Sequence, residues 1–323
     1  MRAFQVTDIG APPALADCTL PEPGPGETRV RIAACGLNFA DLLMIEGKYQ
    51  ERPDPPFTPG MEVAGRIEAL GPGVEGPAPG TRVAVFAGQG GLAEAGVFPA
   101  ERCVPLPDTM DDITAAAFQV AYGTAHVALA HRAALQPGET LLVTGAAGGV
   151  GLTAVEMGAL LGARVIAVAR GPERLAVARA AGAHHLIDSD TADLRAAVKA
   201  LGGADVVYDP VGGALFDAAL RACNPGARLL PLGFASGAVP QIPANILLVK
   251  NLTVHGFYWG GYVKLAPQVL RESLATLFAW HAEGRLKPHV SHVLPLDRTA
   301  EALALLRDRR ATGKVVVTTG AAP

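Results

Sequence analysis

From residue 140 onward, short apolar runs alternate with segments of helical pattern, and this alternation limits the possible folds more than any other feature. TLLVT (140–144), ARVIAVA (163–169) and DVVYD (205–209) are such runs, and helical stretches separate them. Fully apolar strands that alternate with helices are typical of a parallel sheet covered on both faces. The sequence therefore predicts an α/β fold that contains a doubly wound sheet of about six strands.

A glycine-rich loop, LLVTGAAGGVG (141–151), joins the first of these strands to the helix that follows it. It matches the dinucleotide-binding pattern G-x-G-x-x-G, except that Ala146 replaces the first glycine. In this pattern Gly148 lets the backbone approach the pyrophosphate, and Gly151 lets the helix pack on the strand. Free N–H groups at the helix N-terminus attract the phosphates. We interpret the loop as a nucleotide site rather than a turn without a ligand, and its expected contacts are Ala147, Gly148, Gly149 and Val150.

The end of the second strand bears on which nucleotide binds. That strand ends at Ala169, Arg170 follows it, and Arg174 lies one helical turn further on. An acid that would bind the ribose hydroxyl of NAD is absent from this position. Guanidinium groups suit a 2′-phosphate by charge and by their fork geometry. The sequence therefore favours NADPH over NADH, with the alternative that both arginines are solvated surface residues.

Composition restricts the class of protein and its partners. Half of the 323 residues are hydrophobic, 18% are charged and the net charge is −3, which argues against disorder and against nucleic acid as a main partner. No apolar run reaches membrane-spanning length, and the start MRAFQV lacks the features of a signal peptide. The four scattered cysteines are typical of reduced thiols in a cytosolic protein. We expect a cytoplasmic protein without nucleic-acid or membrane partners.

The pattern of strand-like and helical segments divides the chain into two domains. Residues 1–110 contain short strands broken by Pro and Gly, which is typical of a small β domain. After about residue 264 the alternation of strands and helices stops, and we expect this tail to return to the first domain. The predicted domains are therefore 1–120 with 264–323 and, between them, a dinucleotide-binding domain at 121–263.

Several stretches together resemble one superfamily over nearly the whole chain. They are ACGLNFADLLMIEGKY (34–49), PFTPGMEVAG (56–65), PGETLLVTGAAGGVG (137–151), DPVGG (209–213) and ATGKVVV (311–317). The chain resembles the medium-chain dehydrogenase/reductase superfamily and, within it, the zinc-free quinone oxidoreductase branch that includes zeta-crystallin. The resemblance implies a GroES-like β domain, a Rossmann domain, and a homodimer joined near Leu252–His255.

Two residues depart from the zinc-dependent members of that superfamily. Asn38 stands where those members have a cysteine ligand, and Met61 stands where they have a histidine ligand. A catalytic zinc needs three N, S or O ligands, so the resemblance implies no metal. What remains is hydride delivery from NADPH to an acceptor that is already electron-poor, either a small-molecule quinone or an α,β-unsaturated carbonyl. The alternatives are a metal-dependent alcohol dehydrogenase and a non-catalytic NADPH-binding protein of the crystallin kind.

The resemblance also indicates candidate site residues. Asn38 would lie beside the nicotinamide, where its amide orients the cofactor or donates to the acceptor oxygen. Asp41 would fix that loop, and the Tyr49 hydroxyl could donate to the substrate, although each also has a structural interpretation. The other expected cofactor contacts come from a helix, from strand ends and from the tail: Thr124, Gly233, Phe234, Ala235, Phe257, Tyr258, Trp259 and Lys314.

Overall fold

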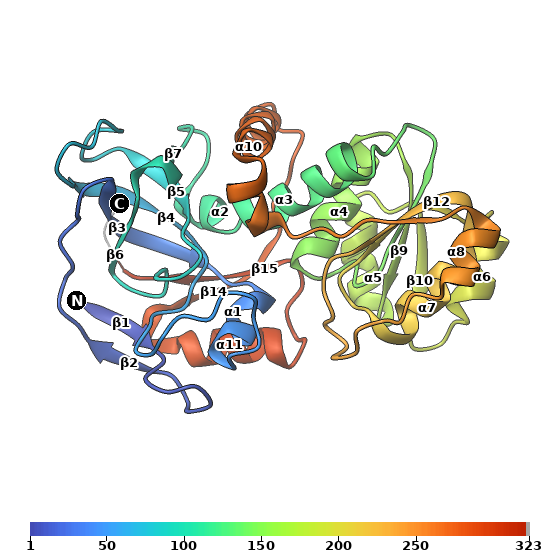
Figure 1. The fold of residues 1–323 in the computed structure, drawn as a ribbon, viewed down its shortest axis with the longest axis horizontal. Coiled ribbons are helices and arrows are strands. Elements are labelled where there is room, and N and C mark those ends of the chain that lie inside the picture. Colours follow the sequence, from blue (N-terminus) through green and yellow to red (C-terminus); the bar gives the residue numbers. More distant parts are fainter. Residues whose placement is uncertain (321–323) are drawn as a thin grey trace. The chain divides into compact units, whose positions relative to one another are not determined.

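The computed structural model describes residues 1–320, which form two compact units. The first unit consists of Met1–Val120 and the chain from Pro288 onward, and the second is Ala121–Lys287. Figure 1 shows the first unit in blue, teal and red and the second mainly in green, yellow and orange. No helix within residues 1–320 is both long enough and apolar enough to cross a bilayer.

The second unit contains a six-stranded parallel sheet in the order β10-β9-β8-β11-β12-β13. The strands are β8 (Thr140–Val143), β9 (Arg164–Ala169), β10 (His185–Asp188), β11 (Ala204–Asp209), β12 (Cys223–Pro231) and β13 (Thr253–Val254). The order reverses direction after β8, as in a doubly wound dinucleotide-binding sheet. The predicted fold class is confirmed.

Helices cover both faces of this sheet. The α-helices that lie wholly or mostly in this unit are α3 (Gln119–His126), α4 (Gly149–Leu160), α5 (Gly171–Ala180), α6 (Leu194–Ala200), α7 (Gly213–Ala222), α8 (Ala244–Lys250), α9 (Tyr262–Leu265) and α10 (Pro267–Ala282). Val198 of α6 and Phe216 of α7 are fully buried against the strand residues Leu142, Ile166 and Val207. Right-handed crossovers then direct α4 and α5 to the opposite face. The sheet is therefore shielded on both sides, which explains why its strands are continuously apolar.

The second domain boundary lies after Lys287, whereas the sequence prediction placed it near residue 264. Helix α10 belongs to the second unit because His126 contacts it twice, through a 2.8 Å bond between Nδ1 and Ser273 Oγ and through an edge-on contact with Trp280. Glu156 of α4 then accepts a hydrogen bond from the backbone N of Lys287 at 2.6 Å. The 3.6-residue period of α10 identifies a helix, but it does not identify the domain on which that helix packs.

The first unit contains a seven-stranded sheet in the order β14-β15-β3-β4-β5-β7, with β6 also paired to β3. Its strands are β3 (Glu27–Gly36), β4 (Glu62–Leu70), β5 (Arg82–Phe86), β6 (Ala95–Pro99), β7 (Cys103–Pro105), β14 (Val290–Pro295) and β15 (Lys314–Thr318). The unit also contains a separate pair of strands, β1 (Arg2–Gln5) and β2 (Ala14–Asp17), and the α-helices α1 (Phe39–Ile45), α2 (Asp112–Ala116) and α11 (Thr299–Arg307).

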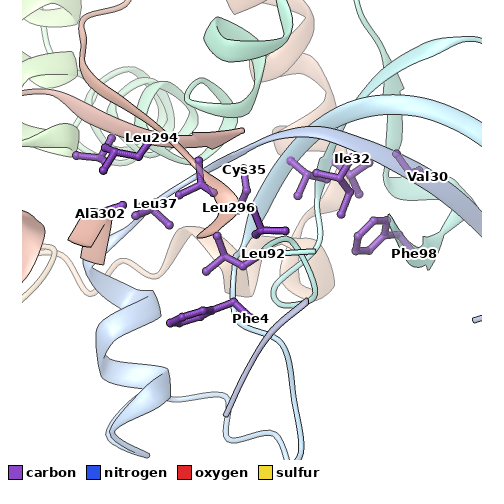
Figure 2. Packing of buried hydrophobic residues seen from close by; sticks show 14 of the residues in the cluster. Phe4, Val30, Ile32, Cys35, Leu37, Leu92, Phe98, Leu294, Leu296 and Ala302 are labelled. Atoms are coloured by element: carbon purple, nitrogen blue, oxygen red, sulfur yellow. The ribbon is translucent and has the colours of Figure 1, made fainter. Parts of the chain in front are cut away.

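The core of the first unit mixes residues from both ends of the chain. Figure 2 shows Cys35 of β3 beside Leu296 from the C-terminal segment, within one buried apolar cluster that also contains Ile32 and Leu294. Strand β15 pairs antiparallel with β3, and Val316 lies opposite Gly36. Strand β4 pairs with the other side of β3, where Glu62 lies opposite the same Gly36. The starts of β4 and β15 therefore meet at the end of β3.

Candidate functional site

Four polar side chains gather at the end of β3, and we call Asn38, Asp41, Glu62 and Lys314 the polar cluster. Asn38 precedes α1, Asp41 lies in its first turn, and Glu62 and Lys314 begin β4 and β15. Counted over the whole residue, main chain included, their exposed fractions are only 9%, 0%, 1% and 5%. Buried charges are costly unless they are paired and hydrogen-bonded, so the bonds within this cluster decide what it can do.

All three N–H bonds of the Lys314 ammonium are donated to acceptors within the first unit. Its Nζ donates to Leu37 O at 2.7 Å, to Asn38 Oδ1 at 2.8 Å and to Glu62 Oε1 at 2.6 Å. An ammonium group has three donors, and three acceptors face it. The cofactor contact expected of Lys314 stays a prediction, and in this structure its ammonium holds the side-chain oxygen of Asn38.

The amide of Asn38 is fixed in one orientation. Its Oδ1 accepts from Lys314, while its Nδ2 donates to Glu62 Oε1 at 3.0 Å and to Gly36 O at 3.3 Å. A flipped amide would point its NH₂ group at the ammonium and its oxygen at the carboxylate. Because both N–H bonds of Nδ2 are used, Asn38 has only the second lone pair of Oδ1 left for a ligand. Toward a bound molecule, Asn38 is an acceptor.

Asp41 ties the start of α1 to the segment that carries Met61. Its two carboxylate oxygens accept from the backbone N of Asn38 at 2.8 Å and of Gly60 at 3.1 Å. Complete burial raises the pKa of Asp41 to about 7, and the two backbone hydrogen bonds oppose that rise. Asp41 therefore positions Asn38 through the main chain and is held within reach of a physiological protonation change.

The other side of Glu62 reaches the last residues of the first unit. Glu62 Oε2 accepts from the backbone N of Val120 at 2.9 Å. The same carboxylate therefore joins Lys314 and Asn38 on one oxygen and the start of α3 on the other. No local sequence pattern shows that Glu62 links three separate segments of the chain.

In the second unit, the glycine loop forms a sharp turn from β8 into α4. Gly148 is exposed and caps α4, and a Cβ on it would meet only Gly145 O, at 3.4 Å. A Cβ on Gly151 would lie 2.1 Å from that same oxygen, so only glycine permits this approach of helix and turn. The exposed N-terminus of a 12-residue helix offers free N–H groups and a positive dipole end. This geometry fits the pyrophosphate of a dinucleotide.

An acid that sequence reasoning missed lies beside the two arginines expected to bind a 2′-phosphate. Asp188 ends β10 and pairs in register with Ala169 at the end of β9. Its Oδ1 accepts from the backbone N of Gly171 at 3.1 Å and of Asp190 at 3.0 Å, which lowers its pKa. Arg170 is exposed and Arg174 is half-buried. The signal was an aspartate at the end of the neighbouring parallel strand, because strands ending at one edge bring their last residues together.

The remaining predicted residues lie at two places in the second unit. Gly233, Phe234 and Ala235 follow β12, and Ala235 N donates to Pro210 O at 3.2 Å, which places this loop at the carboxyl edge of the sheet.

The three adjacent aromatic residues Phe257, Tyr258 and Trp259 pack against different neighbours. Trp259 is 5% exposed and packs so closely on α3 that a Cβ on Gly123, next to Thr124, would lie 2.8 Å from its indole. Phe257 instead meets Tyr262 with ring centroids 5.5 Å apart, and the ring of Tyr258 covers Gly260 and Gly261.

Comparison with known proteins identifies the family. The alcohol dehydrogenase GroES-like domain matches residues 24–108, and the zinc-binding dehydrogenase family matches residues 149–279. The quinone oxidoreductase-like protein 2 homolog of Nematostella vectensis is 41% identical over 325 residues, which cover 98% of this chain and 89% of that protein. The chain belongs to the zinc-free quinone oxidoreductase branch of the medium-chain dehydrogenase/reductase superfamily.

Two further relatives are similar to this chain over most of its length. The quinone oxidoreductase of Thermus thermophilus, solved alone and in complex with NADPH, is 37% identical with a TM-score of 0.87, over 99% of this chain and 100% of that one. The human synaptic vesicle membrane protein VAT-1 homolog is 32% identical over 93% of this chain and 81% of its own length. The family expected from the sequence motifs is confirmed.

Membership of this branch is consistent with the surroundings of Met61, the residue at the place of a zinc-ligating histidine. Met61 is 2% exposed and packs with Val6, Met44 and Phe57 in a small apolar cluster. Tyr49, a candidate substrate contact, packs against the same cluster. Within residues 1–320, no group of three or more His, Cys, Asp and Glu side chains could hold a metal ion. The thioether of Met61 serves as a core side chain of the first unit.

Proposed function

We propose that this protein is an NADPH-dependent oxidoreductase that reduces a quinone or an α,β-unsaturated carbonyl without a metal ion. The observation that carries the proposal is the ammonium of Lys314, fixed 2.8 Å from Asn38 Oδ1 and 2.6 Å from Glu62 Oε1. A positive charge already neutralises the carboxylate that accepts from Asn38 Nδ2. A second cation at this place would be repelled, because like charges at such distances in a buried site interact strongly.

NADPH is the cofactor that fits the second unit. The NADPH complex of the Thermus thermophilus relative supports this assignment, as do the exposed N-terminus of α4 and the exposed Arg170 beside β9. In this proposal the pyrophosphate binds over Gly148, and Arg170 and Arg174 bind the 2′-phosphate. When bound, the nicotinamide supplies a hydride. Thr124, the loop Gly233–Ala235 and the segment Phe257–Trp259 form the remaining cofactor contacts of the proposal.

The polar cluster has a positioning role in this proposal. Asn38 accepts an N–H from the carboxamide of the cofactor through its free Oδ1 lone pair, and Lys314 and Glu62 prevent the amide from flipping. Without a Lewis acid to polarise an unactivated carbonyl, hydride transfer requires an acceptor that is already electron-poor. Quinones and enones meet that requirement.

The proposal extends to assembly and location. Strand β13 has only two residues and ends the sheet, and nearby on α8 Leu248 and Val249 are 78% and 76% exposed. An exposed apolar surface beside a sheet edge supports the expected homodimer near Leu252–His255. The four cysteines are free thiols, which supports the cytoplasmic location expected from the sequence.

The test is NADPH oxidation by metal-stripped protein against a panel of quinones and α,β-unsaturated carbonyls, with NADH in parallel. We expect turnover without metal and faster turnover with NADPH than with NADH. Activity that appears only after zinc is restored would instead support a metal-dependent alcohol dehydrogenase. Tight NADPH binding without turnover of any acceptor would support a non-catalytic NADPH-binding protein.

A further inference from the structure

A buried donor near the polar cluster lacks a partner. Gln119, the first residue of α3, is 2% exposed, and among the described residues no acceptor lies within hydrogen-bonding distance of its Nε2. Buried side-chain amides nearly always find partners, so an unpartnered one requires an explanation. A group that is satisfied only when a ligand is bound provides that explanation.

Two contacts join the segment around Gln119 to the segment around Asn38. The next residue, Val120, donates its backbone N–H to Glu62 Oε2, while Glu62 Oε1 accepts from the Asn38 side chain. Just before Gln119, the chain packs against the end of β3, where a Cβ on Gly36 would lie 1.9 Å from Ala116 O. The segment that carries Gln119 is therefore fixed to the segment that carries Asn38 on both sides of the glutamine.

The donors of Asn38 cannot serve an acceptor oxygen without breaking existing bonds. Both N–H bonds of its Nδ2 go to Glu62 Oε1 and Gly36 O, and the ammonium of Lys314 is used in the same way. When hydride adds to the β-carbon of an enone, the π electrons shift to the carbonyl oxygen, which becomes an enolate oxygen. A positioned donor aimed at that oxygen stabilises the developing charge. In the first unit, Gln119 Nε2 is a buried donor without a partner, and the backbone N of the next residue donates to Glu62 of the polar cluster.

We propose that Gln119 Nε2 donates a hydrogen bond to the carbonyl oxygen of the acceptor and stabilises the negative charge that hydride addition places there. This inference rests on the proposed function and names the residue that recognises its substrate. Gln119 keeps its proton throughout: the hydride forms the new C–H bond, the enolate oxygen receives the electron pair, and solvent later supplies the proton. The site therefore selects acceptors with an oxygen conjugated to the carbon that receives the hydride.

The test compares wild type with Gln119→Met, which has similar volume and no donor, and with Gln268→Met, an exposed glutamine of α10, as the matched control. With 2-cyclohexen-1-one and NADPH, we expect Gln119→Met to lower kcat about 100-fold, the effect typical of losing one oxyanion donor. The Kd for NADPH should change less than about twofold, because the amide contacts the acceptor rather than the cofactor. A kcat within about threefold of wild type, or a loss confined to NADPH affinity, would overturn the inference.

A second measurement does not depend on turnover. The infrared band of [carbonyl-¹³C]2-cyclohexen-1-one bound together with NADP⁺ should lie at lower frequency in wild type and in Gln268→Met than in Gln119→Met, because a hydrogen bond weakens the C=O bond. If wild type shows this shift but turns over no enone, the proposed function fails while the assignment of Gln119 stands. If the band is the same in all three proteins, or if the ketone does not bind, the assignment of Gln119 is wrong. Gln119→Leu repeats both measurements with a second apolar side chain.

Discussion

Lys314 Nζ lies 2.6 Å from Glu62 Oε1, and the two side chains are 6% and 1% exposed. This ion pair joins the first residue of β15 to the first residue of β4 across 252 positions of sequence. Its ammonium also holds the oxygen of Asn38, and its carboxylate also holds the amide nitrogen. The pair therefore couples the stability of the first unit to the orientation of Asn38, which is proposed to hold the carboxamide of the cofactor.

Lys314→Met should destabilise the protein by about 3–5 kcal/mol, because it leaves the Glu62 carboxylate buried without its counter-charge. Lys48→Met is the matched control, since it breaks an ion pair with Glu46 whose side chains are 69% and 49% exposed, and it should cost less than about 1 kcal/mol. The double variant Lys314→Met with Glu62→Gln should recover part of the loss by removing the unpaired charge. Urea unfolding gives the unfolding free energy of wild type and of the three variants. Equal losses of free energy in the two single lysine variants would show that the buried ion pair stabilises the protein no more than the exposed one.

The sequence predicts those parts of the fold and of the site that short stretches of residues encode, and it does not predict contacts between residues far apart in the chain. The strand–helix alternation and the turn at Gly151 are local patterns, and the doubly wound sheet followed from them. The contact between Lys314 and Glu62 depends on β15 and β4 flanking the same strand, which no local periodicity encodes. No sequence pattern singles out Gln119, because the absence of a hydrogen-bond partner is a property of the packed chain alone.

Asp41 should make stability depend on pH in a direction opposite to most carboxylates. Its folded pKa of about 7 lies above the ordinary value of 3.8, so between these values the unfolded chain has released the proton that the folded chain keeps. Relative to Asp41→Asn, the unfolding free energy of wild type should therefore fall with rising pH across this window, by about 1.4 kcal/mol per pH unit, and level off above it. Chemical unfolding of both proteins at several pH values gives the difference. Parallel curves would mean that Asp41 ionises at its ordinary pKa.

Asp188→Asn should increase the preference for NADPH over NADH by about fivefold, because it removes a negative charge close to Arg170 while the amide oxygen can still accept from Gly171 N. Asp190→Asn, two residues further on, is the matched control for a general change of charge. The ratio of kcat/KM for the two cofactors is the readout. An equal shift in both variants would show that the long-range field, and not the contact of Asp188 with the start of α5, sets the preference.

Replacing each of two glycines in the same loop by alanine should change different properties: stability for Gly151 and NADPH affinity for Gly148. In Gly151→Ala the new methyl group would lie 2.1 Å from Gly145 O, so either the turn or α4 must move, and we expect a loss of about 2 kcal/mol or more in unfolding free energy. In Gly148→Ala the nearest atom is 3.4 Å away and φ is −81°, which alanine adopts without strain, so stability should change by less than about 0.5 kcal/mol. The methyl group of Gly148→Ala nevertheless projects from the exposed cap of α4, where the pyrophosphate is proposed to bind, and we expect about tenfold weaker NADPH binding. Fluorescence titration with NADPH and urea unfolding together separate the two effects. Unchanged NADPH affinity in a stable Gly148→Ala protein would place the phosphates elsewhere on the second unit.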